Sequence, residues 1–421
     1  MEREVFNKRI LVIGGGISGL TTALEAAEAG YKVILVEKEA FLGGRVARLN
    51  KYYTKLCPPS CGLEINFKRI KRNPDIQYFT LAEVESVSGE EGNYDVAIKV
   101  NPRYVNDNCT ACGECEKVCV TEVENDFNLG MNKAKAAYLP YPMAFPMKYV
   151  LSSKIIGTDE AKKCIEACKY NAIDLGMKAV TINIKVGSIV VATGWKPYDA
   201  AKIDNLGFGK YKNVITNVMM ERLAASNGPT NGRILRPSDG KEAKNVIFAQ
   251  CAGSRDENHL PYCSAVCCLA SMKQAAYVRE QYPEDKATIF YIDIRALGKY
   301  EDFYTKTASD ENISFVKGKV AKIEEDPDTK DPIVVAEDTL SGEKIRVKAD
   351  LVVLATGIVP NMSDNKIPVN ITCDEFGFLV SNLSKTGIYA AGCARKPIDV
   401  AGAVQDATGV ALKAIQSTLR R

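Results

Sequence analysis

The N-terminal part of the chain alternates apolar runs with a glycine-rich turn. Residues 9–13 form a β-branched apolar run that ends in the turn of residues 14–19, and residues 20–29 continue with helical periodicity. A second apolar run, residues 32–36, stops at Glu37. The order of strand, glycine turn, helix, strand and acidic residue predicts a βαβ unit.

A second α/β pattern follows later in the chain. It opens with an apolar strand at residues 245–249, continues with a helix from about residue 264 to 281, and ends with the apolar run 351–355. Between the two patterns, residues 101–178 break the rhythm with clustered cysteines and prolines. We therefore expect an α/β protein with two similar blocks and a small inserted module.

The cysteine and histidine content says more about the reaction chemistry of this protein than its net charge does. With 55 basic and 52 acidic residues the net charge is +3, which gives no reason to expect nucleic-acid binding. No apolar stretch approaches the roughly 18 residues that would span a membrane, and no cleaved signal peptide is recognisable, so we expect a cytoplasmic protein without a membrane span. The chain has 14 cysteines and a single histidine, His259, which points away from histidine-based catalysis and toward flavin and cluster chemistry.

The glycine turn carries the complete fingerprint of a dinucleotide site. Gly14 permits a tight turn, Gly16 lets the backbone approach a pyrophosphate, and Gly19 allows close helix packing. Glu37 would accept a hydrogen bond from a ribose hydroxyl. The candidate binding residues of this turn are Gly14, Gly15, Gly16, Ser18, Gly19, Glu37 and Lys38.

Further motifs favour FAD over NAD as the ligand of this turn. They are Gly43-Gly44-Arg45, the turns Ala192-Thr193-Gly194 and Ala355-Thr356-Gly357, and the segment 388–392 that ends at Gly392. Together they resemble the flavoprotein family with two dinucleotide-binding domains that includes the thioredoxin reductases. That resemblance implies contacts to the flavin from Gly44, Arg45, Ala192, Thr193, Gly194 and Gly392. It also implies an aspartate that contacts the flavin after Gly392. This chain has Cys393 there, so that contact must be rearranged, and we count Cys393 among the candidate cofactor-binding residues.

The inserted module contains the ligand run of a bacterial ferredoxin. Cys109, Cys112, Cys115 and Cys119 follow the C-x2-C-x2-C-x3-C spacing. In two-cluster ferredoxins the fourth cysteine of one run serves the other cluster, and the second run survives here only as Cys164 and Cys168. We expect one [4Fe–4S] cluster on Cys109, Cys112, Cys115 and Cys168, with Cys119 as the alternative fourth ligand.

A second group of cysteines replaces a second glycine turn. The strand at 245–249 runs into Cys251 instead of a phosphate turn, which argues against NAD(P)H binding there. Cys263, Cys267 and Cys268 follow, the first two at i and i+4 if the helix has begun. From spacing alone, these four residues are cluster ligands, buried small side chains or a redox dithiol.

The segments 54–61, 102–119, 138–149, 250–268 and 391–404 resemble the A-type component of heterodisulfide reductase, which carries the FAD and iron–sulfur clusters of that enzyme in methanogens. This resemblance implies a further [4Fe–4S] cluster on Cys251, Cys263, Cys267 and Cys268. The shorter length of the chain is most like the A-type component of the quinone-interacting membrane-bound oxidoreductase of sulfate reducers. That family implies a larger homologous flavin and iron–sulfur protein, a membrane quinone-reactive protein and adenylylsulfate reductase as partners, at the cytoplasmic face of the membrane.

The expected fold is therefore a thioredoxin-reductase-like α/β flavoprotein with an inserted ferredoxin-like module. Its segments are residues 1–100, 179–240 (with a hinge) and 351–421 for the FAD-binding domain, 101–178 for the inserted module, and 241–350 for the second nucleotide-binding-like domain.

The main functional hypothesis is an electron-transfer subunit that links membrane quinone to adenylylsulfate reductase in sulfate respiration. The alternatives are a self-standing flavin-dependent NAD(P)H or disulfide reductase and an electron-bifurcating subunit of the heterodisulfide reductase type. All three are oxidoreductases, and the role of Cys57 and Cys61 stays open.

Overall fold

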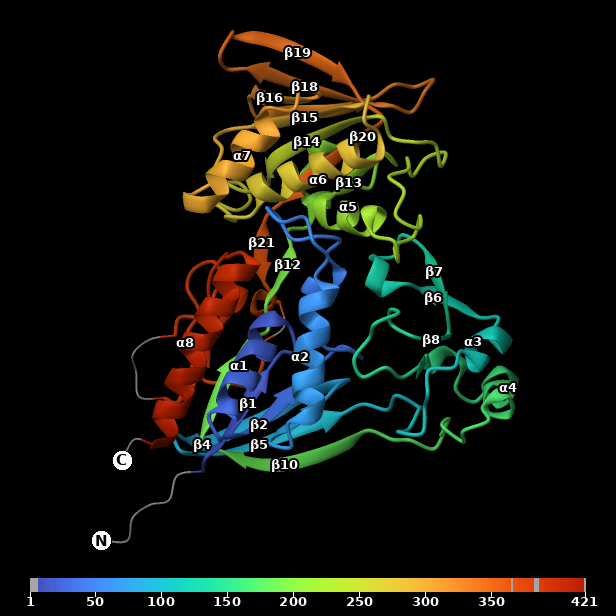
Figure 1. Ribbon diagram of the computed structural model, residues 1–421, viewed down its shortest axis with the longest axis vertical. Coiled ribbons are helices and arrows are strands. Elements are labelled where there is room, and N and C mark those ends of the chain that lie inside the picture. The colour runs from blue at the N-terminus through green and yellow to red at the C-terminus, as the bar shows by residue number, and fades with distance from the viewer. Residues whose placement is uncertain (1–6, 365, 382–385, 420–421) are drawn as a thin grey trace. The chain divides into compact units, whose positions relative to one another are not determined.

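The parallel sheet that begins at the glycine turn organises the first compact unit of the computed structural model, which describes residues 7–364, 366–381 and 386–419. Its five strands run in the order β22-β11-β1-β2-β3. They are β1 (Arg9–Ile13), β2 (Lys32–Val36), β3 (Ile76–Phe79), β11 (Ser188–Val191) and β22 (Ile388–Ala390). Figure 1 labels the neighbouring strands β1 and β2 of this sheet. The apolar runs are buried on both faces, as expected for a parallel sheet that is covered on each side.

Helices and a second sheet cover that core. Helix α1 (Ile17–Glu28) packs against α8 (Val400–Leu419), and α2 (Ser60–Arg72) also contacts α1. An antiparallel sheet of β4 (Ala82–Glu90), β5 (Asn93–Val100) and β10 (Val180–Val186) packs its apolar residues into the same core as β1 and β11. This first unit thus has helices and an antiparallel sheet around one parallel sheet.

The inserted module lies between β5 and β10 and has its own small core. It contains the short helices α3 (Glu114–Val118) and α4 (Asp159–Ala167), which pack against each other. Its strands are β6 (Glu122–Glu124), β7 (Lys133–Lys135), β8 (Ala137–Tyr138) and β9 (Val150–Leu151). Its buried cysteines pack with Tyr149 and Ile155 in one apolar cluster.

The second compact unit also contains a five-stranded parallel sheet. Its five-stranded order is β13-β20-β14-β15-β16. The strands are β13 (Val214–Thr216), β14 (Asn245–Ala252), β15 (Lys286–Tyr291), β16 (Ile313–Lys317) and β20 (Leu351–Thr356). Helices α5 (Asn217–Ala224), α6 (Cys267–Gln281) and α7 (Glu301–Ala308) accompany it, with an antiparallel sheet of β17 (Val320–Glu325), β18 (Pro332–Asp338) and β19 (Glu343–Lys348).

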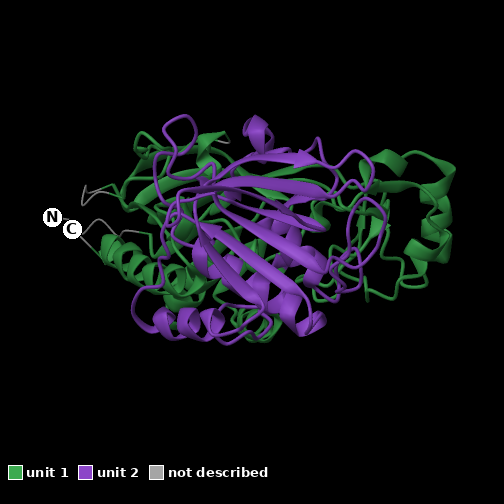
Figure 2. Cartoon of the chain, turned by 90° about the horizontal axis from the view of Figure 1, so that it is seen from above, with its two compact units in different colours: residues 1–47, 60–195, 360–421 green, residues 48–59, 196–359 purple. Residues whose placement is uncertain are grey.

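The compact units divide the chain differently from the expected segments. Unit 1 comprises residues 1–47, 60–195 and 360–421, and unit 2 comprises 48–59 and 196–359 (Figure 2). Residues 196–240 and 351–359, which we assigned to the FAD-binding domain, therefore lie in unit 2. The reason is strand pairing, because β13 and β20 pair with each other and β20 pairs with β14. Strands β12 (Trp195–Pro197) and β21 (Ile358–Pro360) pair where the chain passes between the units.

Candidate functional site

The glycine turn after β1 has the backbone geometry that the fingerprint requires. Gly14 has a φ of +107°, in the left-handed region, and its amide donates to the carbonyl of Val36 at 2.7 Å. A Cβ on Gly14 would lie 2.3 Å from the Ala192 carbonyl oxygen, and one on Gly19 would lie 1.8 Å from the Gly14 carbonyl oxygen. Both glycines are thus required by the fold itself.

Gly16 differs from these two glycines, because its environment is open. Its backbone is extended, and a Cβ there would meet only the Gly44 Cα, at 4.0 Å. Gly44 approaches from the other side with a φ of +54°. Since Gly16 is the N-cap of α1 and no side chain caps that helix, the first-turn amides of α1 face an open backbone cradle.

Glu37 sits at the end of β2 in a buried position beside the cradle. Its Oε2 accepts from the Gly15 amide at 2.6 Å, and its Oε1 accepts from the Glu39 amide at 2.7 Å. Burial raises the pKa of the Glu37 carboxyl from 4.5 to about 7, against the lowering effect of those amides. Each carboxylate oxygen keeps a second lone pair for a ribose hydroxyl. The neighbouring Lys38 is exposed to solvent.

The Ala192-Thr193-Gly194 turn closes the carboxyl end of β11. Asn361 fixes this turn, donating its side-chain amide to the Thr193 carbonyl at 2.7 Å and its backbone amide to the Gly194 carbonyl at 3.2 Å. The Thr193 hydroxyl oxygen is buried, yet it finds no hydrogen-bond partner among the described residues. A buried polar atom without a partner is costly, so this hydroxyl is a candidate contact for a bound ligand.

Arg45 and Cys393 take positions that the sequence motifs did not reveal. The Arg45 guanidinium lies over the ring of Trp195 at 4.7 Å, and its Nε donates to the Trp195 carbonyl. Burial raises the pKa of the Cys393 thiol to about 11, and its Sγ donates to the Ile398 carbonyl at 3.2 Å. Cys393 is therefore a protonated thiol engaged with its own loop.

Gly392 is held by a carboxylate that sequence reasoning missed. Its amide donates to Asp406 Oδ2 of α8 at 2.8 Å, and Asp406 also pairs with Arg395. A Cβ on Gly392 would lie 2.1 Å from the Ser18 hydroxyl, so the two residues are in close contact. Nothing in the local sequence signals Asp406, because it is brought to the turn by the packing of α8.

These observations fit a bound FAD. The open cradle at Gly16 and Gly44, the uncapped start of α1, the acidic Glu37 and the unpartnered Thr193 hydroxyl lie at the carboxyl ends of neighbouring strands in one unit. Parallel α/β sheets bind nucleotides at that edge.

Four cysteines of the inserted module lie around one pocket. Cys109, Cys112, Cys115 and Cys168 line one pocket, together with Tyr149 and Tyr170. Cys112 is exposed, whereas Cys115 is buried. Burial, together with the nearby thiols of Cys164, Cys109 and Cys112, raises the pKa of Cys115 to about 12. The pocket therefore offers four sulfur donors around one volume.

Cys119 does not line that pocket. It is 2% exposed, and its Sγ accepts the Ala137 amide at 3.3 Å. Cys164 is fully buried at 0% exposure, and its Sγ donates to the Cys115 carbonyl at 3.5 Å. Cys168 thus lies around the same pocket as the first three cysteines and Cys119 does not, and the identity of the fourth ligand stays a prediction.

The cysteines of unit 2 also converge. Burial raises the pKa of Cys267 well above its ordinary value, and the next causes are the neighbouring thiols of Cys251, Cys268 and Cys263. Helix α6 begins at Cys267, so Cys263 lies in the loop before it and not on the same helical face. The reason is local, because Ala265 has a φ of +60° and the Ser264 hydroxyl accepts the Ile358 amide at 2.9 Å.

Backbone strain marks this second group. Cys251, Arg255 and Ala265 have φ values of +55°, +57° and +60°, which non-glycine residues rarely adopt. Cys251 also lies at the irregularity in the pairing of β14 with β20. Asp293 pairs with Arg255, and the Arg295 amide donates to Cys268 Sγ at 3.5 Å. These contacts hold thiols and cations together where a phosphate turn would otherwise lie.

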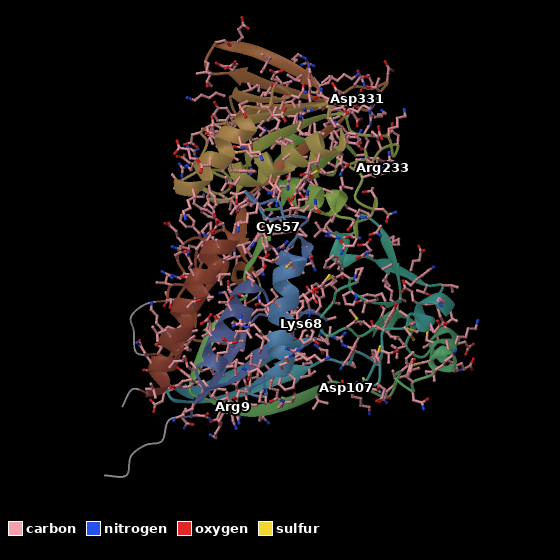
Figure 3. The ribbon with its side chains drawn as sticks, viewed as in Figure 1. Arg9, Cys57, Lys68, Asp107, Arg233 and Asp331 are labelled. Carbon is pink, nitrogen blue, oxygen red and sulfur yellow. The ribbon has the colours of Figure 1, made fainter. Side chains whose placement is uncertain are left out.

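Within the described residues, no three or more histidine, cysteine or acidic side chains are arranged to hold a single metal ion. Each ligand of a four-iron cluster binds a different iron, so its cysteines surround a volume instead of meeting at one point. Cys57, labelled in Figure 3, and Cys61 at the start of α2 are both exposed. No helix in the described ranges is long and apolar enough to cross a membrane.

Comparison with known families and structures agrees with the flavin site. Residues 9–50 match the FAD dependent oxidoreductase family, which confirms FAD and the predicted class of oxidoreductase. Thioredoxin reductases from T. acidophilum and Lactococcus lactis align with 98% of this chain and with 100% and 99% of their own chains. Their TM-scores are 0.54 and 0.53, and their identities are 16% and 14%. The predicted thioredoxin-reductase-like α/β fold is thus confirmed.

Other proteins are more similar to this chain in sequence than the thioredoxin reductases are. The chain is 41% identical over 419 residues to the A 2 iron-sulfur subunit of the CoB–CoM heterodisulfide reductase of Methanopyrus kandleri, covering 96% of this chain and 64% of the relative. It is 39% identical over 424 residues to the corresponding iron-sulfur protein of Methanocaldococcus jannaschii, covering 96% and 63%. The A component of the ferredoxin:CoB-CoM heterodisulfide reductase of Methanosarcina acetivorans is 36% identical, with 97% and 56% covered. The chain thus spans less than two thirds of the length of these relatives.

Proposed function

We propose that this chain is the flavin and iron–sulfur electron-transfer subunit of an oxidoreductase complex of the heterodisulfide reductase type. The observation that carries the proposal is the combination, in one chain, of an FAD cradle with two groups of four cysteines. The similarity to proteins named for iron–sulfur content and heterodisulfide reduction supports the same conclusion. Their names point to the CoB–CoM heterodisulfide as the substrate of the complete complex.

Each group of residues is suited to hold one of the cofactors. FAD exchanges electrons in pairs or singly, whereas iron–sulfur clusters carry one at a time, so the two together suit a junction between kinds of carrier. Gly16, Gly44 and the start of α1 would bind the pyrophosphate, and Glu37 the ribose. Cys109, Cys112, Cys115 and Cys168 would hold one cluster, and Cys251, Cys263, Cys267 and Cys268 another.

The second unit offers no glycine turn for a nicotinamide nucleotide. Strand β14 leads directly into Cys251, and the would-be Cβ of Gly253 lies 2.7 Å from the ring of Tyr198. That loop is filled by protein, which disfavours a self-standing NAD(P)H reductase. Electrons must then enter and leave through partner proteins.

The sequence relatives favour the heterodisulfide reductase type over the quinone-linked complex of our main hypothesis. A larger homologous protein, a membrane quinone-reactive protein and adenylylsulfate reductase therefore remain predictions that rest on family resemblance alone. Electron bifurcation likewise remains a prediction.

Anaerobic purification followed by flavin and iron analysis tests the proposal. We expect one flavin and about eight irons per chain, from two four-iron sites. NADH should leave the flavin absorbance unchanged, while a reduced ferredoxin should bleach it. Rapid bleaching by NADH would instead support the self-standing reductase.

Matched serine variants test the ligand set of the inserted module. Cys168→Ser should remove about four irons, whereas Cys164→Ser should leave the iron content nearly unchanged. If Cys119→Ser removes the iron and Cys168→Ser does not, the crossing arrangement is refuted.

A further inference from the structure

The inserted module keeps the spacing of a second cysteine run in which two positions are no longer cysteine. Counting back from Cys168 by the intervals of the first run leads to Cys164, Ala161 and Thr158. In a two-cluster ferredoxin, these three positions together with Cys119 would hold the second cluster. All four positions of a second cluster site are therefore present at the expected spacing, but only two of them are cysteine.

The structure brings these positions together around α4. Cys119 and Cys164 belong to the same apolar cluster, and helices α3 and α4 pack against each other. Thr158 caps α4 by accepting the Ala161 amide at 3.5 Å, and Ala161 is fully buried at 0% exposure. Small side chains thus stand at the two positions that a second cluster would need as cysteines.

Glu160, in the first turn of α4, reaches from this helix to the segment that follows Cys119. Its Oε1 accepts from the backbone amides of Val120 and Thr121 at 2.5 and 2.8 Å. Its Oε2 accepts from the Thr121 hydroxyl at 2.5 Å. One carboxylate therefore joins the two chain segments that a shared second cluster would join.

We propose that the Glu160 carboxylate occupies the place of a second iron–sulfur cluster, so that the module is a two-cluster fold with one latent site. An anion here satisfies amides that would otherwise lack partners, and it links α4 to residues 119–121 as bound metal would. The proposal rests on the proposed cluster at Cys109, Cys112, Cys115 and Cys168. It implies that electrons enter and leave the module through that single cluster, beside the exposed Cys112.

Restoring the missing ligands in the full chain tests the latent site. The triple variant Thr158→Cys/Glu160→Ala/Ala161→Cys, reconstituted anaerobically with iron and sulfide, should hold about four more irons per chain than the parent. Magnetic coupling between two close clusters should broaden its EPR spectrum. The control Thr158→Ser/Glu160→Ala/Ala161→Ser should gain no iron. Adding Cys119→Ser to the cysteine variant should abolish the gain.

The outcomes separate this proposal from the proposed function. Iron in the unmodified chain tests the first cluster, whereas only the increment in the triple variant tests the second site. A triple variant with normal flavin content and no more iron than its serine control overturns the proposal.

A single substitution keeps the test decisive if the triple variant does not fold. Glu160→Ala should release residues 119–121, so that the buried Cys119 thiol reacts with a maleimide at least about tenfold faster than in the parent. Glu166→Ala, on the exposed face of the same helix, is the matched control and should not change the rate. An unchanged rate in Glu160→Ala would also overturn the proposal.

Discussion

Replacing Gly16 with valine should remove the flavin without unfolding the protein. The backbone at Gly16 is extended, so valine needs no change of conformation, and its Cβ would lie 4.0 Å from the nearest atom, the Gly44 Cα. By contrast, a Cβ on Gly19 would lie 1.8 Å from a backbone oxygen. A side chain at Gly16 should therefore interfere with flavin binding, whereas a side chain at Gly19 should already interfere with folding.

The expected effect on flavin binding is larger than the expected effect on folding. A changed N-cap residue costs about 1 kcal/mol of stability. Forcing extra methyl groups into a filled site costs about 1–3 kcal/mol or more, and 1.4 kcal/mol is a tenfold change in affinity. We expect flavin affinity to fall about tenfold to hundredfold, while the unfolding free energy of the flavin-free protein falls by no more than about 1 kcal/mol.

The assay is the flavin-to-protein ratio of the purified variant, followed by titration with FAD. Gly409→Val is the matched control, because Gly409 is exposed on α8 with nothing within 4 Å of its would-be Cβ. One tightly bound flavin per chain in the Gly16 variant would refute the assignment of the cradle.

Three further predictions concern the second cysteine group, a titrating carboxyl and a buried ion pair. Cys267→Ser should lower the iron content by about four per chain, whereas the exposed Cys373→Ser should not; equal iron in both would reject the unit 2 cluster. Folding raises the pKa of Glu37 from 4.5 to about 7. The contribution of Glu37 to the unfolding free energy of the flavin-free chain is therefore fully present below pH 4.5. It is lost as pH rises through 7, which lowers that free energy by about 3 kcal/mol. Urea unfolding at pH 5 and 8 should show this loss in the parent but not in Glu37→Gln. Lys273→Met should cost about 3–5 kcal/mol of unfolding free energy, since Lys273 Nζ lies 3.0 Å from Glu221 and their side chains are 3% and 4% exposed. The double variant with Glu221→Gln should recover part of that loss, and an additive double variant would contradict the pairing.

The sequence predicted the features whose information is local. The glycine spacing and Glu37 define the βαβ turn within a short stretch, and the cysteine spacing predicted that Cys168 lies with Cys109, Cys112 and Cys115. Asp406 and Glu160 were missed because each reaches its partner only through helix packing. The compact units divide the chain after residue 195 and not at 240, because the pairing of β13 with β20 joins residues more than a hundred positions apart.

The interleaved order of strands in unit 1 determines when the protein can mature during synthesis. Strand β1 pairs with β11 near residue 190, and β11 pairs with β22 near residue 390. At about 5–20 residues per second, roughly 20–70 s separate the emergence of β2 from that of β22. Most of unit 2 is one continuous stretch, residues 196–359, so it can fold within that interval. The proposed FAD cradle is therefore completed late, after the cysteines of both groups have left the ribosome.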